Sequence, residues 1–361
     1  MNKAYRFRIY PNKEQVTLLA KTFGCVRFIY NHMLEDKINH YEKTKENLLT
    51  TPTQYKAEFK WLKVVDSLAL ANAQLHLQTA YKNFFRDPKV GFPKFKSKHK
   101  GDKSYTTNLV NGNISIDGKY LKLPKLGRIK VKQHRSIPGN FKLKSVTVSK
   151  TPTGKYYASL LYEYELIVEY KKPMSFVGLD FSMKELYVSS EGEIASYNRF
   201  YRRSQDKLAR EQRKLSNMEL GSKNRNKQRI KVARLHERIA NQRKDFLHKK
   251  SRQITNGYDA VCIEDLNMKG MAQALNLGKS VSDNGWGMFR TMLSYKLAEQ
   301  GKTIVIIGKW FPSSKLCSSC GKAKDELPLS ERTYRCECGF ECDRDVNAAR
   351  NILNEGIRLL A

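Results

Sequence analysis

Apolar residues near the start of the chain recur with the spacing of a helix that buries one face. After a short basic strand expected from Tyr5 to Tyr10, they follow one another at three- and four-residue steps. The first series is Val16, Leu19, Phe23, Val26, Tyr30 and Met33, and the second is Leu70, Ala73, Leu77, Ala80 and Phe84. The pattern predicts a small helical module from about Lys13 to Phe85, which helix packing alone would explain.

The pattern changes between Ser104 and Glu165, where short alternating segments are separated by turn-forming residues. Turns are expected at residues 111–113, 116–119 and 151–154. Such segments form antiparallel hairpins. Their many lysines suit a barrel-like sheet that contacts a nucleic acid backbone rather than its bases. Residues 171–173, Lys-Lys-Pro, mark the end of this region.

The second half of the chain alternates strands with helices. Residues 174–198 predict three short strands joined by turns, and residues 197–250 predict a basic helical hairpin broken near Gly221. Two apolar strands follow within residues 259–266 and 303–310, separated by a helix near Met288 to Glu299. This alternation indicates an α/β core. A length of 361 residues favours two or three modules over one compact fold.

The charge of the chain points to its partner. Lys and Arg number 67 against 35 Asp and Glu, a formal net charge of +32 that a polyanion must offset. A ribosomal-type or membrane-surface protein would also be basic, but the 11% aromatic content and the apolar patterns favour folded domains. Neither a membrane-spanning run nor an apolar signal core is found, so we expect a protein that meets nucleic acid in the cytoplasm.

Two segments carry candidate nucleic acid contacts. The segment GFPKFKSKHK, residues 91–100, mixes lysines with phenylalanines that can stack on bases, although a solvated linker has the same composition. The second segment is the basic hairpin, whose cations would repel one another unless a nucleic acid lies alongside. A charged face exposed to solvent is the alternative explanation for this hairpin. The candidate residues are Lys94, Lys96, Lys98, Arg202, Arg203, Arg210, Arg213, Arg234 and Arg238.

Four of the seven cysteines lie close together in the sequence. Cys317 and Cys320 form a CxxC pair, and Cys336 and Cys338 form a CxC pair that Gly339 follows. Two close pairs of thiolates suit one tetrahedral zinc ion, and the glycine permits the tight turn that such a pair requires. The CxC pair is one residue shorter than usual. A structural zinc site is predicted, with a redox role as the alternative.

Three acidic residues stand where a charge would be unfavourable without a metal ion. Asp180 ends the apolar strand SFVGLD, Glu264 ends the apolar strand in AVCIED, and Asp345 lies at the start of a helix in DRDVNAARNIL. Taken singly, they are explained as a turn residue, a rim charge and a helix cap. Together they predict a two-metal phosphodiesterase site in a ribonuclease H-like sheet, with Asp265 and Asp343 as neighbouring decoys.

Along nearly its whole length the chain resembles the TnpB proteins, the RNA-guided nucleases encoded by bacterial insertion sequences. The matching segments are YRFRIYPNKEQ, FGCVRFIYN, GFPKFKS, GLDFSMKELYVSS, DFLHKKS, IEDLNMKGM, GWGMFRTMLSYK, FPSSKLCSSCG, YRCECGFECDRD and VNAARNIL. Type V CRISPR effector nucleases share the catalytic core but are usually longer, so the length favours the transposon-encoded branch.

The resemblance implies a role for each candidate residue. Asp180, Glu264 and Asp345 match the RuvC carboxylates that hold two Mg²⁺ ions, and the four cysteines match a zinc ribbon with one Zn²⁺. Arg332 resembles a basic residue that helps to place the scissile strand in related nucleases. The implied partners are a guide RNA from the end of the mobile element and target double-stranded DNA, with sequence specificity supplied by base pairing.

The resemblance also implies a multidomain α/β architecture. Its parts are a RuvC-like (ribonuclease H-like) nuclease core with an inserted zinc ribbon, and an N-terminal β-barrel, wedge-like domain with an inserted helical recognition module. The expected bounds are 1–11 and 100–171 for the β-barrel, 12–99 for the helical module, 172–315 and 340–361 for the nuclease, and 316–339 for the ribbon.

The expected function is therefore RNA-guided, Mg-dependent cleavage of double-stranded DNA next to a short adjacent motif, associated with a transposable element. A regulator that binds nucleic acid without cutting it, guided or not, has the same composition, and only the carboxylates separate the two. A transposase or transposase accessory protein is a third possibility, because strand transfer also uses three acids. The family resemblance favours cleavage.

Overall fold

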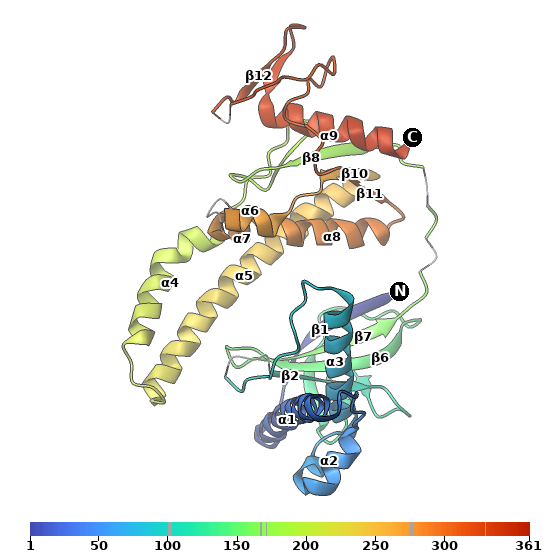
Figure 1. Cartoon of the computed structure of the whole chain (residues 1–361), viewed down its shortest axis with the longest axis vertical. Helices are drawn as coiled ribbons and strands as arrows, with labels where there is room; N and C mark the ends of the chain where they lie inside the picture. Colours follow the sequence, from blue (N-terminus) through green and yellow to red (C-terminus); the bar gives the residue numbers. More distant parts are fainter. Residues whose placement is uncertain (100–102, 167, 171, 275–277, 329) are drawn as a thin grey trace. The chain divides into compact units, whose positions relative to one another are not determined.

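The computed structural model describes residues 1–99, 103–166, 168–170, 172–274, 278–328 and 330–361, and the chain divides into two compact units (Figure 1). Unit 1 is Met1–Leu166 and unit 2 is Ile167–Ala361. The expected domain limits at residues 100 and 171 lie outside the described residues, as does the last lysine of the 91–100 segment.

The described part of unit 1 contains a seven-stranded sheet in the order β2-β6-β7-β1-β5-β4-β3. Its strands are β1 (Asn2–Tyr10), β2 (Lys103–Asn108), β3 (Ser115–Asp117), β4 (Tyr120–Leu123), β5 (Gly127–Lys132), β6 (Lys142–Lys150) and β7 (Tyr156–Glu163). All the pairings are antiparallel, which confirms the hairpins expected from the alternating pattern. Ile9 lies opposite Val131 on one side and Tyr156 on the other, so three strands contribute to one core.

The expected helical module of unit 1 is also present. It consists of α1 (Lys13–Thr44), α2 (Pro52–Glu58), the 3-10 helix η1 (Lys60–Val64) and α3 (Ser67–Arg86). α1 begins with a capping box, in which the Asn12 side chain accepts from the backbone N–H of Gln15 at 2.8 Å and the Gln15 side chain accepts from that of Asn12 at 3.0 Å. The apolar faces of α1 and α3 share a single core with the sheet.

The described part of unit 2 is built on a four-stranded sheet in the order β11-β10-β8-β9. Its strands are β8 (Phe176–Phe181), β9 (Tyr187–Ser189), β10 (Ala260–Glu264) and β11 (Thr303–Ile307). β8, β10 and β11 are parallel, and β9 is antiparallel to β8. Val261, Cys262 and Ile263 are fully buried, as expected for a parallel sheet covered on both faces. The α/β class predicted from the sequence is confirmed.

Helices cover both faces of this sheet (Figure 1). α5 (Lys223–Gly257) and α8 (Trp286–Ala298) pack on the face to which Val261 and Ile263 point. α9 (Arg344–Leu360) packs on the opposite face, where Ile352 meets Cys262. This face admits the helix closely because Gly178 has no side chain, and a Cβ there would lie 2.1 Å from the carbonyl oxygen of Ala349.

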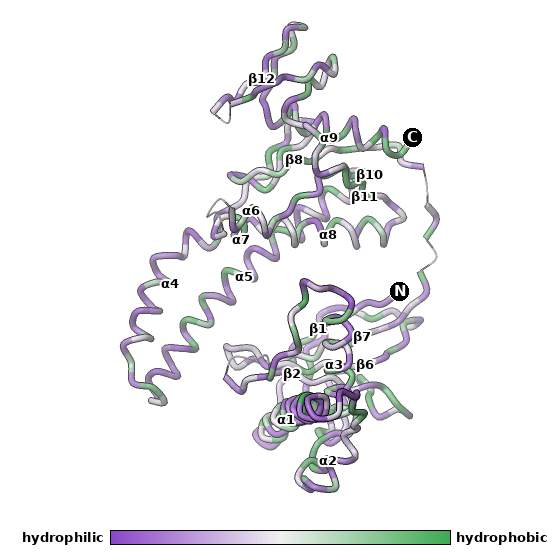
Figure 2. The backbone as a smooth tube through the Cα atoms, in the orientation of Figure 1, coloured by the Kyte–Doolittle hydropathy of each residue, from purple (hydrophilic) through white to green (hydrophobic). Residues whose placement is uncertain are grey.

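The predicted basic hairpin is formed by α4 (Phe200–Ser216) and α5, with its break at residues 217–222. Figure 2 shows both helices as mostly hydrophilic. One buried acid, Glu211 on α4, accepts a hydrogen bond from Gln228 Nε2 at 2.8 Å and forms an ion pair with Lys231 at 3.0 Å, both on α5. This contact joins the two helices and offsets part of the repulsion among their cations.

Four short elements complete unit 2. They are α6 (Met268–Ala274) and α7 (Gly278–Asn284), between β10 and α8, and the antiparallel pair β12 (Thr333–Arg335) and β13 (Glu341–Asp343), between β11 and α9. Across the described part of the chain, no helix combines the length and the apolar character needed to cross a membrane.

Candidate active site and cysteine cluster

Asp180 and Glu264 reach the same edge of the unit 2 sheet on neighbouring parallel strands. Leu179 pairs with Ile263, so Asp180 and Glu264 follow side by side at the carboxyl ends of β8 and β10. Successive side chains of a strand point to opposite faces. Because Leu179 and Ile263 pack towards α5 and α8, Asp180 and Glu264 point to the face that carries α9.

The start of α9 brings Asp345 to this edge. The helix is capped by Asp343, whose carboxylate accepts from the backbone N–H groups of Asp345 and Val346 at 2.9 and 3.1 Å. The capping role considered for Asp345 thus belongs to Asp343. Asp345 lies in the first turn, half-buried, with its carboxylate 3.4 Å from Arg344 Nε. The helix N-terminus carries a partial positive charge that favours acids here.

The three carboxylates interact electrostatically. Burial raises the pKa of Asp180 well above its usual range, the negative charges of Glu264 and Asp345 raise it further, and Arg344 opposes both effects. Burial also raises the pKa of Glu264, against a hydrogen bond that Ser313 Oγ donates to Glu264 Oε1. Acids that repel one another in a partly desolvated site favour a bound cation. The structure therefore brings together the three acids, and their role as metal ligands stays a prediction.

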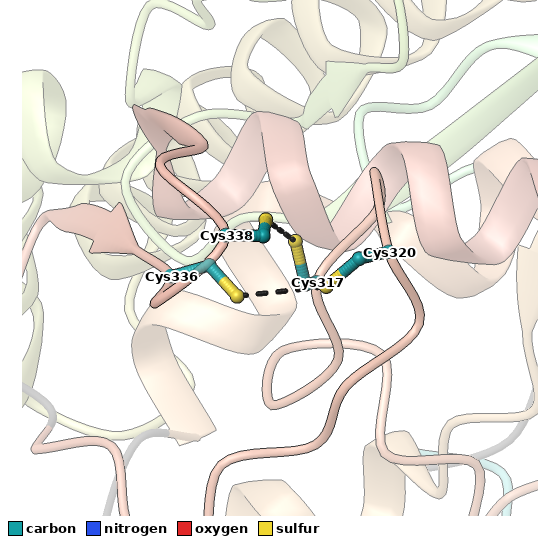
Figure 3. Close-up of side chains that lie close together, drawn as sticks. All are labelled: Cys317, Cys320, Cys336 and Cys338. Atoms are coloured by element: carbon teal, nitrogen blue, oxygen red, sulfur yellow. Dashed lines mark hydrogen bonds between the residues drawn. The ribbon is translucent and has the colours of Figure 1, made fainter.

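The four cysteines form a compact cluster (Figure 3). Their sulfurs all lie within 4.8 Å of one another, with 3.8 Å between Cys317 and Cys338 and 3.6 Å between Cys320 and Cys336. Four thiolates about 2.3 Å from one zinc ion in a tetrahedron would lie about 3.8 Å apart. Gly339 adopts a φ of 85°, which confirms the need for glycine in this turn.

The acids are spread more widely than the sulfurs. Within the described ranges, the four cysteines form the only group of at least three Cys, His, Asp or Glu residues whose ligand atoms all lie within 4.8 Å of one another. A two-metal site does not require such a tight set, because two ions about 4 Å apart share ligands that need not all contact one ion.

Two buried asparagines of α9 hold the segment that connects the two sites. Asn351 Nδ2 donates to the carbonyl oxygens of Ser313 and Leu316 at 2.8 and 2.7 Å. Asn347 Nδ2 donates to the same Leu316 oxygen at 2.6 Å, and its Oδ1 accepts from the backbone N–H of Ser318 at 2.9 Å. Residues 313–318 thus lie along α9, with the hydrogen-bond partner of Glu264 at one end and Cys317 near the other.

The remaining predicted site residues lie at the surface. Arg332 is exposed, and its carbonyl oxygen accepts from the backbone N–H of Arg344 at 2.8 Å, beside the start of α9. Asp265, next to Glu264, forms an ion pair with Arg290 at 2.9 Å. The exposed candidate contacts to nucleic acid are Lys94, Lys96, Lys98, Arg202, Arg203, Arg210, Arg213, Arg234 and Arg238.

The described part of the 91–100 segment is fixed to α1. Asn31 Nδ2 donates to the carbonyl oxygen of Lys96 at 3.0 Å, and the backbone N–H of Lys96 donates to Asn31 Oδ1 at 2.8 Å. The Lys96 ammonium also lies 3.9 Å from the centre of the Tyr30 ring. These contacts argue against the solvated linker that was the alternative for this segment.

Three residues that shape the site were not singled out from the sequence. Ser313, Asn347 and Asn351 are polar side chains that are at most 5% exposed. The two asparagines stand four residues apart, each directly before a buried apolar residue of the helix, Ala348 and Ile352. An amide on the buried face of an amphipathic helix indicates a buried partner, so the signal was present in VNAARNIL.

Comparisons with known proteins agree with this architecture. Residues 159–275 match the OrfB model of insertion sequence IS605, described as a probable transposase, and residues 286–352 match the TNB domain of Cas12f1-like proteins. Residues 1–46 match a model described as a helix-turn-helix domain, although they form β1 and α1 here.

Full-length relatives and a solved structure extend the match. A Streptomyces pristinaespiralis protein named "Putative RNA-guided DNA endonuclease" is 37% identical over 99% of this chain and 90% of its own length. InsQ of Escherichia coli K12, with the same description, is 31% identical over 99% of this chain and 93% of its own length. A cryo-EM structure of a Cas12f1–sgRNA–target DNA complex shares the fold, with a TM-score of 0.60 and 13% identity over 98% of this chain and 99% of that one.

The TnpB-like protein L770 of Acanthamoeba polyphaga mimivirus is 26% identical over 98% of this chain and 73% of its own length. The relatives thus match this chain nearly from end to end, including the segments that carry the three acids and the four cysteines. The chain belongs to the TnpB family of proteins encoded by insertion sequences.

Proposed function

We propose that this protein is an RNA-guided endonuclease that cleaves double-stranded DNA next to a short adjacent motif, in association with a transposable element. The observation that carries the proposal is the convergence of Asp180, Glu264 and Asp345, from β8, β10 and α9, at one edge of the unit 2 sheet. The names of the full-length relatives support RNA guidance and DNA cleavage.

Oxygen donors from three carboxylates suit Mg²⁺, which prefers hard ligands. When bound, the ions would activate water and stabilise the leaving oxygen of the phosphodiester. The chain's own residues hold the ligands in place: Asp180 and Glu264 lie on rigid strands, and Ser313 fixes one oxygen of Glu264 and leaves the other for a cation. Arg344, next to Asp345, adds positive charge beside Asp180, and we assign Arg332 to the placement of the scissile strand.

We propose that the cysteine cluster holds one structural Zn²⁺, because four sulfurs at tetrahedral spacing are otherwise hard to explain in a cluster without disulfides. The ribbon around it would occupy residues 316–339, inside a nuclease domain of residues 172–315 and 340–361. The β-barrel domain (1–11 and 100–171) and the helical module (12–99) would then recognise the adjacent motif and the guide–target heteroduplex.

The basic surfaces fit the proposed partners. The exposed cations of the 91–98 segment and of the α4–α5 hairpin present a charge excess that guide RNA and target DNA would neutralise. The protein would act in the bacterial cytoplasm, where it reads the adjacent motif while base pairing reads the target. Purified protein should therefore carry a discrete RNA, and its affinity for nucleic acid should fall steeply with added salt.

Substitution of the acids tests the nuclease. Asp180→Ala or Glu264→Ala should abolish cleavage of plasmid DNA while RNA and DNA binding stay nearly intact, because the acids serve the metal ions and not the basic surfaces. Asp265→Ala is the matched control, since this acid neighbours Glu264 but pairs with Arg290 instead. Undiminished cutting by Asp180→Ala would refute the assignment of these acids to the active site. Absence of cutting by the wild-type chain would leave a non-cleaving, nucleic-acid-binding regulator as the better explanation.

A further inference from the structure

A tight turn beside the proposed active site exposes a tryptophan. β11 ends at Ile307, and the backbone N–H of Phe311 donates to the carbonyl oxygen of Gly308 at 3.1 Å, so Lys309 and Trp310 occupy the centre of the turn. Trp310 is 86% exposed. The next residue, Phe311, packs against the core that β10, β11 and α9 share. The turn is therefore anchored by one aromatic ring and presents the other to solvent.

Both ends of this turn touch the residues that carry the proposed chemistry. Ile307 is the strand partner of Glu264, and Ser313 donates a hydrogen bond to the Glu264 carboxylate. Trp310 is three residues from each of these contacts. A residue of extended chain spans at most about 3.6 Å, so the Cα of Trp310 lies within about 11 Å of both Ile307 and Ser313. The indole borders the site without being one of its ligands.

Packing does not explain the position of this side chain. The chain has three tryptophans, of which Trp286 is 1% exposed and Trp61 is 47% exposed and in ring contact with Phe28 and Phe59. Among the residues that the structure describes, Trp310 makes no ring contact with another aromatic side chain, and the Lys309 ammonium lies 4.6 Å from the centre of its ring. A single exposed apolar side chain is common on protein surfaces, but this ring lies beside the proposed active site with an ammonium group next to it.

A ring and an ammonium side by side match the two halves of a nucleotide. A base can stack on the indole, and the adjacent phosphate can pair with Lys309. Stacking on an aromatic side chain tolerates every base, which suits a site where pairing with a guide has already supplied specificity. Stacking also requires an unpaired base, and a DNA strand displaced by a guide has unpaired bases.

We infer that Trp310 is a stacking platform for an unpaired base of the DNA strand that is cut at the site of Asp180, Glu264 and Asp345. This inference rests on the proposed function, because it takes the nucleic acid at this edge to be the strand that is cut. The platform would hold the strand against the sheet edge and would contact no metal ion. Trp310 is thus a binding residue for single-stranded DNA and not a catalytic one.

The test compares two fluorescein-labelled probes of equal length, an oligothymidylate and an abasic oligonucleotide with the same phosphates. Binding is measured by fluorescence anisotropy on the full chain as purified, in an Asp180→Asn background that prevents cutting. Trp310→Ala should weaken binding of the oligothymidylate by roughly 5- to 150-fold, the range for loss of one stacked base. The abasic probe should bind as before, and Trp310→Phe should recover most of the affinity.

Lys309→Gln provides the matched control, because loss of a phosphate contact should weaken both probes alike. Equal affinity of Trp310→Ala and the parent for the oligothymidylate would overturn the inference, and so would an equal loss on both probes. Cleavage of plasmid DNA by the wild-type chain is measured separately. Failure there refutes the proposed nuclease, whereas the difference between the probes reports on Trp310 alone.

Discussion

Replacement of Asn351 by alanine should release the 313–318 segment from α9 and speed the loss of zinc. Asn351 Nδ2 donates to the buried carbonyl oxygen of Ser313 and to the partly buried one of Leu316. An unsatisfied buried carbonyl costs about 1–3 kcal/mol, and Leu316, which keeps its bond from Asn347, would lose about 1 kcal/mol more. The total loss of stabilisation is about 2–4 kcal/mol, so the population of the state in which this segment is detached from α9 should rise by roughly 30-fold or more.

The assay follows zinc release to a chromophoric chelator, with urea unfolding in parallel. Asn354→Ala is the matched control, since Asn354 lies on the same helix but is exposed, and an exposed substitution should change stability by at most about 0.5 kcal/mol. Faster zinc release from Asn351→Ala alone is the expected result. Equal release rates and equal urea midpoints for the two variants would refute the argument that the asparagine holds the ribbon.

Three further outcomes are expected. Ser313→Ala should slow single-turnover cleavage by about 10- to 100-fold, because a hydrogen bond to a charged group is worth about 1.5–3 kcal/mol, and Ser313→Thr should recover part of the rate. Gly178→Ala should lower the free energy of unfolding by about 3 kcal/mol or more, because its Cβ would meet the backbone of α9, whereas Gly287→Ala, with no atom within 4 Å, should cost nothing measurable by thermal unfolding. Elemental analysis should find about one Zn²⁺ per chain in the native protein and none in Cys317→Ser; native protein without zinc would remove that assignment.

Sequence reasoning succeeded where the signal was local. The apolar runs in SFVGLD and AVCIED placed Asp180 and Glu264 at strand ends. Parallel pairing then brought the two acids together, because Leu179 and Ile263 are in register. The cysteine spacing predicted a metal site that needs only two tight turns to form. The structure places the four sulfurs within 4.8 Å of one another. The fold class followed from alternating strands and helices, whose order along the chain decides which elements can be neighbours.

Partners far apart in the sequence were beyond such reasoning. A solvated charged face was the alternative for the basic hairpin as a whole, yet within it Glu211 is buried by its partners on α5. The buried face of α9 could be predicted to need hydrogen bonds, but not that residues 313–318 would supply them.

The position of α9 after the ribbon in the chain has a consequence during translation. Asp345 joins the other two acids only once this helix has been synthesised and has docked on the face where Gly178 leaves room for it. A nascent polypeptide on the ribosome would thus expose its cationic hairpin, and could capture RNA, before any cutting centre exists.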